Sequence, residues 1–365
     1  MYRWQKTFFQ LLRSGLWERQ VEDLSVFSLT KEEWWLVYNE SVRQTVQGLC
    51  YMGLQYLPDE CYPPQEVVSK WMSSAIAVKE KNAKVCSVTA AIYKMLTKGG
   101  VTPVLMKGQA VGQYYEKPPL RVCGDIDLYI ADNHQFDTAC DLLSLNKMPY
   151  HISADGSACF YDNEVEVELH HQLVDVQRPR SIRYVSSLLE DETFGVMQLT
   201  YDVAIKVPSP MVTLLMLNAH IMKHVFTVGV GLRQFCDMAR AYHTLDKQYD
   251  HEKLASIIQD LGLGKWTALL HGLLTEYLGL PIGDLPYQSD AVNSINLLQK
   301  VLAWGNFGQQ TVSWNKAADS SWKMKLHTVK RITSGMPYSL RLAPIETIYI
   351  IKNLIKGQLI NSKNE

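Results

Sequence analysis

The chain has 365 residues, of which 47% are hydrophobic and 20% are charged, and its formal net charge is −1. This composition is typical of a globular protein and excludes an intrinsically disordered chain. The near-neutral charge argues against a long nucleic acid as a partner, because binding along a phosphate backbone needs a basic surface.

The cysteines and the first residues indicate the compartment. The seven cysteines are odd in number and form no C-x-x-C pair, which argues against a disulfide framework and against a zinc ribbon. Arg3, Lys6 and Arg13 interrupt the apolar residues near the start of the chain, so no signal peptide is predicted. No segment approaches the run of about 18 apolar residues that a spanning helix needs. We therefore expect a cytoplasmic protein without a membrane span.

The first hundred residues are predicted to be helical. The region up to about residue 60 has aromatic and aliphatic side chains at helical spacing, namely Phe8, Leu11, Leu12, Trp34, Trp35 and Tyr38. A long helix follows from about Glu66 to Lys98, and Gly99 and Gly100 are a typical signal for its end.

The pattern then changes to short strands. Val104–Lys107 and Gly124–Ile130 are predicted strands, and residues 134–144 carry a clean apolar helix face. Asp162-Asn163 indicates a hairpin turn, after which apolar and acidic residues alternate up to His170. These elements predict an α+β fold with a small mixed-sheet core.

The chain becomes helical again after this core. Ser209 followed by Pro210 is typical of a helix N-cap, and apolar helical patterns continue to the end of the chain. The predicted division is therefore a helical region over 1–100, an α/β core over 101–207 and a helical domain over 208–365.

Two aspartates stand on the second predicted strand. Side chains alternate along a strand, so Ile126, Leu128 and Ile130 point to one face while Asp125 and Asp127 point to the other. Two carboxylates on one face repel each other unless a cation lies between them. Mg²⁺ bound by both carboxylates would relieve this repulsion. A solvent-facing strand edge without function is the alternative for this motif taken alone.

Two neighbouring features favour a metal and phosphate site. A third acidic ligand is available on the strand that ends at His170, in Glu168, with Glu166 in reserve. Upstream, Lys107-Gly108 ends a strand and enters a short predicted helix, Gln109 to Tyr115. A glycine at this point allows the backbone to approach a phosphate.

The segments KGQAVGQYYEKPPLRVCGDIDLYI and EVEVELHHQL resemble nucleotidyltransferases of the DNA polymerase beta superfamily. Within it they resemble a bacterial family that carries K-G, G-D-I-D-L and E-L-H motifs, over residues 104–173 and more loosely after Ser209. The resemblance implies a polymerase-beta-like core in which Asp125, Asp127 and Glu168 are catalytic and bind Mg²⁺ or Mn²⁺. It implies transfer of a nucleoside monophosphate from an NTP, with ATP as the expected donor, to an unknown hydroxyl acceptor on a small molecule or a protein, assisted by two metal ions.

The same resemblance places five residues at the nucleotide, namely Lys107, Gly108, Gln109, Arg121 and His170. Gly108 corresponds to the glycine of the phosphate turn, and Gln109 stands where serine or glycine is usual. Lys107 and Arg121 are candidates to hold phosphate oxygens, although either can be a surface cation. His170 is expected to orient a carboxylate, to contact the nucleotide or to be a structural histidine.

The helical domain offers two further pairs. His220 and His224 have the spacing of zinc ligands, but no glutamate follows His220, so the H-E-x-x-H hydrolase signature fails. Packing or polar contacts to the nucleotide cleft are the preferred interpretations. Arg233 and Asp237 lie one helical turn apart and are predicted to form an ion pair, which could also line the cleft.

Two classes of function follow. The first is an active nucleotidyltransferase, which the intact set of three carboxylates favours. The second is a catalytically impaired nucleotide-binding or interaction protein with the same fold, which the altered residue Gln109 favours. A metal-dependent phosphohydrolase is disfavoured, because its usual histidine–aspartate pairs are missing.

Overall fold

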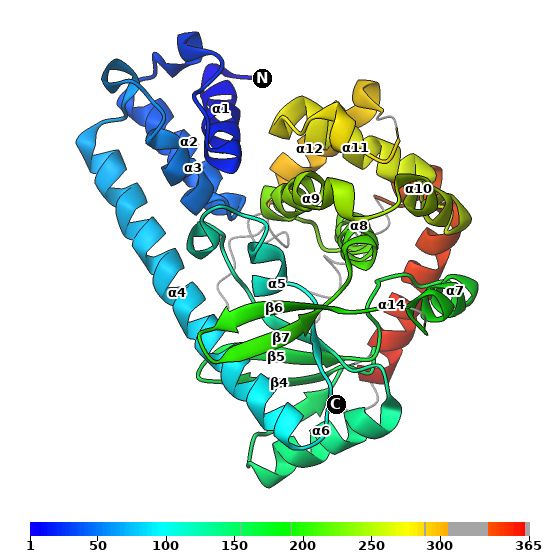
Figure 1. The fold of residues 1–365 in the computed structure, drawn as a ribbon. Coiled ribbons are helices and arrows are strands. Elements are labelled where there is room, and N and C mark those ends of the chain that lie inside the picture. Colours follow the sequence, from blue (N-terminus) through cyan, green and yellow to red (C-terminus); the bar gives the residue numbers. More distant parts are fainter. Residues whose placement is uncertain (154, 191, 288–289, 306–334, 362–365) are drawn as a thin grey trace.

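The computed structural model describes residues 1–365 apart from 154, 191, 288–289, 306–334 and 362–365. It has an α+β fold in which one seven-stranded sheet is accompanied by helices from both halves of the chain (Figure 1). The predicted fold class is therefore confirmed. No helix in the described part of the chain is both long enough and apolar enough to cross a membrane. All seven cysteines are free.

The N-terminal helices are α1 (Arg3–Trp17), α2 (Lys31–Arg43), α3 (Gln47–Leu54) and α4 (Gln65–Lys98). The long helix predicted to end at Lys98 is confirmed as α4. It packs against α2 and α3 at one end and runs along the sheet, so it connects the N-terminal helices with the sheet (Figure 1).

Glycines allow α1 and α3 to pack with their backbones in contact. A Cβ atom added to Gly15 would lie 1.8 Å from the carbonyl oxygen of Leu49, and one added to Gly53 would lie 2.2 Å from that of Leu11. Backbone atoms cannot move aside as a flexible side chain can, so no larger residue fits at this crossing.

We expect Gly15→Ala to lower the free energy of unfolding by about 3 kcal/mol or more, because the added methyl group forces the two helices apart. Urea unfolding followed by circular dichroism measures this loss. Gly283→Ala is the matched control, since a Cβ atom there meets nothing within 4 Å. Equal stability of the two variants would contradict the close crossing.

The sheet has the strand order β3-β4-β5-β2-β1-β7-β6. Its strands are β1 (Val104–Leu105), β2 (Ile126–Tyr129), β3 (Tyr150–Ile152), β4 (Ala158–Asp162), β5 (Val165–His170), β6 (Gly195–Thr200) and β7 (Val203–Val207). The pairs β2–β5 and β1–β7 are parallel, and the other neighbouring pairs are antiparallel.

The hairpin predicted near Asp162-Asn163 is confirmed. It joins β4 to β5 through Asn163 and Glu164, whose φ angles are 47° and 62°. Two consecutive residues with positive φ match the right-handed twist of the flanking strands.

Several predicted elements are shorter in the structure. The strand predicted over Val104–Lys107 ends at Leu105, because Lys107 and Gly108 already form the turn into the next helix. That helix, α5 (Gln109–Gly112), is one turn long and does not reach Tyr115. The strand predicted over Gly124–Ile130 is limited to the four residues that pair with β5, which are those of β2.

The two faces of the sheet have different partners. Ile126 and Leu128 of β2 belong to an apolar cluster with α4 and α6 (Asn133–Leu145), which cover that face. Tyr129 and Met106 belong to the other apolar cluster, which includes the helices that follow the sheet. Asp127 therefore lies on the face turned toward those helices, as the alternation along the strand predicts.

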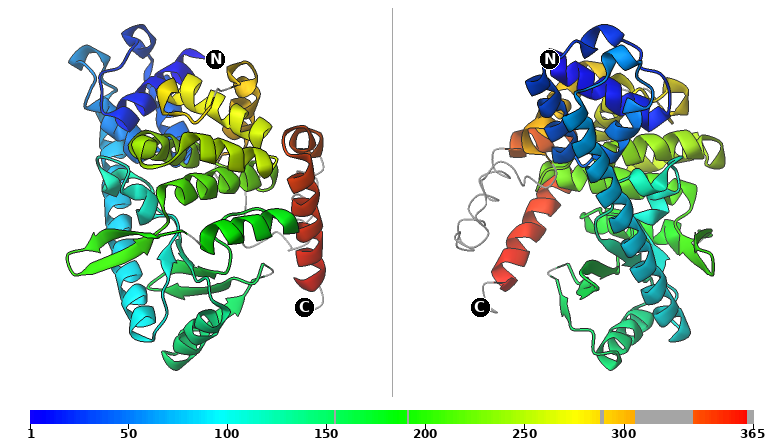
Figure 2. Two further views of the ribbon diagram at one scale, coloured as in Figure 1. Left: turned by 45° about the vertical axis from the view of Figure 1, so that its right-hand side comes forward. Right: turned by 90° about the vertical axis from the view of Figure 1, so that its left-hand side faces the viewer.

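The later helices are α7 (Pro179–Glu190), α8 (Pro210–Phe226), α9 (Leu232–Leu245), α10 (His251–Asp260), α11 (Gly264–Leu278), α12 (Ala291–Trp304) and α14 (Pro344–Asn361). Ser209 caps α8 as predicted, since its side chain accepts a hydrogen bond from the Val212 N–H. Glu346 of α14 accepts hydrogen bonds from the backbone N–H groups of Gln177 and Arg178, so α14 lies beside the start of α7 (Figure 2).

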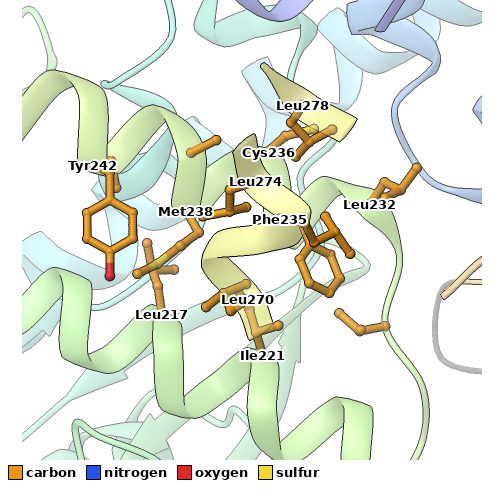
Figure 3. Packing of buried hydrophobic residues seen from close by; sticks show 14 of the residues in the cluster. Leu217, Ile221, Leu232, Phe235, Cys236, Met238, Tyr242, Leu270, Leu274 and Leu278 are labelled. Atoms are coloured by element: carbon orange, nitrogen blue, oxygen red, sulfur yellow. The ribbon is translucent and has the colours of Figure 1, made fainter. Parts of the chain in front are cut away.

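Helices α8, α9 and α11 form the apolar centre of this half. Figure 3 shows the packed side chains, among them Leu217, Ile221, Phe235, Met238, Leu270 and Leu274. Phe8 and Leu12 of α1 belong to the same cluster, so the N-terminal and C-terminal helices share one core. The division of the chain after residues 100 and 207 stays a prediction.

Candidate functional site

Asp127 and Glu168 lie directly opposite each other on neighbouring strands. They are register partners in the parallel pair β2–β5, and His170 follows two residues later on the same face of β5. One ligand atom from each of these three residues lies within 4.8 Å of the others. The structure therefore brings together Asp127, Glu168 and His170. Asp127 and Glu168 are two of the three carboxylates that the sequence analysis predicts as metal ligands.

His170 is bound at both ring nitrogens. Its Nε2 lies 2.9 Å from Asp127 Oδ1 and 3.2 Å from Glu168 Oε2, and its Nδ1 lies 2.9 Å from the Ser157 hydroxyl. Burial alone would lower the pKa of the imidazole, but the hydrogen bonds to the two carboxylates raise it to about 9. His170 is therefore protonated at neutral pH and donates a hydrogen bond from Nε2 to the carboxylates.

Lys107 holds the opposite side of Asp127, with Nζ 3.3 Å from Oδ1. Burial disfavours the charge on Asp127, but Lys107 and His170 outweigh it and hold the pKa of this carboxyl far below its usual range. Asp127 is thus a fully ionised carboxylate between two cationic groups.

Asp125 lies just before β2 and is more exposed than Asp127. It lines the same pocket but is outside the group of ligand atoms formed by Asp127, Glu168 and His170. The negative charge of Asp127 raises the pKa of Asp125. This repulsion indicates that the two carboxylates are close enough to influence each other. Glu166, the reserve candidate for the third ligand, is not among the residues that line this pocket.

The carboxylates line a pocket of about 300 Å³. Lys107 and Gly108 form part of its wall, and residues of α8 and α9 form another part. Gly108 has φ 61° and ψ −116°, a conformation that only glycine adopts without strain. The neighbouring Gln109 is not among the residues that line this pocket, and its side-chain Nε2 donates a hydrogen bond to Cys123 Sγ at 3.2 Å.

Arg121 is also at this pocket, but its guanidinium is already bound. Its Nε and Nη2 lie 2.6 Å and 2.7 Å from the two carboxylate oxygens of Asp237, and only 4% of Arg121 is exposed. The Tyr115 hydroxyl donates to the same carboxylate at 2.8 Å. The predicted ion pair between Arg233 and Asp237 is wrong, because Arg121 reaches Asp237 from the turn before β2 and takes its place.

We expect Arg121→Met to lower the free energy of unfolding by about 3–5 kcal/mol, because the Asp237 carboxylate then stays buried without its cation. Arg121→Lys keeps the charge but loses the two parallel hydrogen bonds, so its loss is smaller. Urea unfolding compares both variants with the wild type. An Arg121→Met variant as stable as the wild type would show that the ion pair between Arg121 and Asp237 does not stabilise the fold.

Three further pocket residues contact one another through polar groups, and of these the sequence indicated only His220. Asp175 accepts hydrogen bonds from His220 Nδ1 at 2.9 Å and from Lys223 Nζ at 2.7 Å. The rings of His220 and His224 lie 4.3 Å apart, edge to face. In the described part of the chain, Asp127, Glu168 and His170 are the group of three side chains spaced to hold a metal, so the pair of histidines on α8 supplies no such site.

Comparison with known proteins adds one finding. The model of a family described as "Uncharacterised nucleotidyltransferase" matches residues 30–279, well over half of the chain. The chain belongs to this nucleotidyltransferase family. No curated protein and no solved structure matches the chain. The match includes the sheet, the residues that line the pocket and helices α8 to α11.

The raised pKa of His170 makes stability depend on pH. Its pKa is about 9 in the folded chain and about 6.5 in an unfolded one, so the stabilisation is complete below about pH 6.5 and is lost as pH rises through 9. We compare the free energy of unfolding of the wild type with that of His170→Gln, in EDTA so that no metal is bound. The wild type should be more stable by the largest margin at pH 6, and this margin should shrink by up to about 3 kcal/mol near pH 10.

Urea unfolding at each pH measures this double difference. His134→Gln is the control, because His134 is exposed on α6. A difference between wild type and His170→Gln that stays constant with pH would contradict a protonated His170 between the carboxylates.

Proposed function

We propose that this chain transfers a nucleoside monophosphate from an NTP to a hydroxyl acceptor, with a core of the polymerase beta type. Its membership of a nucleotidyltransferase family supports the reaction class. The observation that carries the proposal is the register of β2 and β5, which places Asp127 opposite Glu168 in a pocket that also contains Gly108.

The residues present fit a divalent cation. Asp127 and Glu168 offer carboxylate oxygens, the ligands that Mg²⁺ and Mn²⁺ prefer, and Asp125 is available at the edge of the same pocket. When bound, such an ion neutralises phosphate charge and lowers the pKa of a coordinated hydroxyl. His170 orients both carboxylates through Nε2, while Ser157 holds the other side of the ring.

The triphosphate needs cationic partners that are not already committed. Arg121 is bound to Asp237, whereas Arg233 forms no ion pair with a carboxylate in the described part of the chain, and its Nη1 donates to the Val122 carbonyl at 3.0 Å. The Nε atom of Arg233 is buried without a hydrogen-bond partner among the described residues. We therefore assign to Arg233 the phosphate contact that the sequence analysis expects at Arg121. Lys107 contacts Asp127 at 3.3 Å and lines the same pocket as a second cation. Gly108 lets the backbone approach the phosphates.

The inward-turned Gln109 favours the second candidate, a nucleotide-binding protein without turnover. The two candidates share the binding site and differ in whether pyrophosphate is released. A test must therefore measure binding and turnover separately.

We expect Mg²⁺ or Mn²⁺ together with ATP to raise the melting temperature of the wild type, with about 2.7 kcal/mol of stabilisation at a ligand concentration of 100 Kd. Pyrophosphate release should depend on the metal. Asp125→Asn should reduce it about 100-fold or more while the melting temperature of the free protein stays near wild type, because Asp125 is exposed. Glu168→Gln should reduce it to a similar extent.

Asp141→Asn is the matched control, since it removes one exposed carboxylate from α6, on the other side of the sheet. Binding without pyrophosphate release in the wild type would favour the second candidate. Full pyrophosphate release by both Asp125→Asn and Glu168→Gln would contradict the proposal that these carboxylates hold a catalytic metal.

A further inference from the structure

A polar cluster on the α8 wall of the pocket has no part in holding the metal or the triphosphate. It consists of Asp175, which follows β5, and of His220 and Lys223 on α8, and all three line the pocket. On the same helix, Leu217 and Ile221 point into the apolar core between α8, α9 and α11 (Figure 3). Packing of that face fixes the rotation of α8 and presents His220 to the carboxylate side of the pocket.

The contacts of His220 define its tautomer. Its Nδ1 lies 2.9 Å from Asp175 Oδ2, and a carboxylate can only accept a hydrogen bond, so Nδ1 carries the proton. Nε2 has no hydrogen-bond partner among the described residues, and its lone pair is available on the pocket side. Lys223 binds the other oxygen of Asp175 at 2.7 Å and holds the carboxylate in place.

The surroundings keep the ring neutral. Burial and the charge of Lys107 lower the pKa of His220, which outweighs the opposite effect of Asp175. Asp175 stays ionised, because Lys223, His220 and Lys107 hold its pKa well below the usual range in spite of burial. The charged and titratable groups facing His220 are thus Asp175, Lys107, Lys223, His224 and Asp127.

We propose that Asp175 and His220 act as a dyad that takes the proton from the acceptor, and that the acceptor group is an alcohol hydroxyl bound between His220 and the carboxylates. This inference rests on the proposed nucleotidyl transfer. A phosphate or carboxylate acceptor is already ionised at neutral pH and needs no base, whereas an alcohol does. A neutral imidazole oriented by a carboxylate is suited to that task.

The acceptor proton moves to His220 Nε2, and the acceptor oxygen forms a bond to the α-phosphorus. The bond from that phosphorus to the bridging oxygen breaks, and pyrophosphate leaves with the electron pair. His220 then releases its proton to solvent, while Asp175 stabilises the transient imidazolium. Glu168 is less suited as the base, since it already accepts a hydrogen bond from the protonated His170.

The test uses the full chain with Mg²⁺ and ATP, and with water or glycerol as the hydroxyl source. His220→Asn keeps an N–H group that can reach Asp175 but removes the base, and His220→Ala opens a space for added imidazole. We expect both variants to keep the rise in melting temperature caused by Mg²⁺ and ATP. Pyrophosphate release should fall by about 10²–10⁴-fold. Imidazole added to His220→Ala should restore it, with the pH dependence of free imidazole.

His134→Ala, on the exposed face of α6, is the matched control and should neither lose activity nor respond to imidazole. Pyrophosphate release by His220→Asn within a few-fold of wild type would overturn the inference, and so would a His220→Ala variant that binds Mg²⁺ and ATP but is not restored by imidazole. A wild-type chain that binds Mg²⁺ and ATP without releasing pyrophosphate would instead overturn the proposed function.

Discussion

The parallel pairing of β2 with β5 is the constraint on which the site depends. The side chains of both strands alternate between two faces, so a shift of one residue in the register would move Glu168 into the apolar cluster beneath α4 and α6. Burial of Ile126, Leu128, Val167 and Leu169 on that face therefore selects the register that brings the carboxylates together on the other. The burial of apolar side chains that stabilises the sheet therefore also places Asp127 opposite Glu168.

This pairing creates a local conflict, and the neighbouring cations relieve it. Neighbouring carboxylates repel each other, and burial disfavours the charge of Asp127. Lys107 and the protonated His170 contact Asp127 from two sides, and the raised pKa of Asp125 shows that the remaining repulsion falls on the more exposed carboxylate. Asp127 is therefore ionised before any ligand binds, and its charge is balanced by two neighbouring cations.

Local patterns in the sequence predicted the features of the fold that depend on residues close together in the chain. The alternation along β2 and β5, the cap at Ser209, the long helix α4 and the hairpin before Val165 were all predictable, because each depends on residues within one or two turns. The partner of Asp237 was not, since two arginines were possible and the nearer one in the sequence was the wrong one. The edge hairpin β6–β7 and helix α7 were also missed, and in β6 the apolar Val196 and Met197 are adjacent, so the strand lacks a regular alternation of apolar and polar residues.

The residues that line the pocket come from two structural layers, the sheet and the helices that face it. The sheet supplies Asp127 and Glu168, whose geometry depends on strand register and tolerates little change. Helices α8 and α9 supply His220, Lys223 and Arg233, whose positions depend on packing in a core shared with the N-terminal helices. Side chains on the pocket face of a helix can be exchanged without disturbing its buried face. We therefore expect differences in acceptor among family members to be found on the pocket faces of α8 and α9, with the β2–β5 pair unchanged.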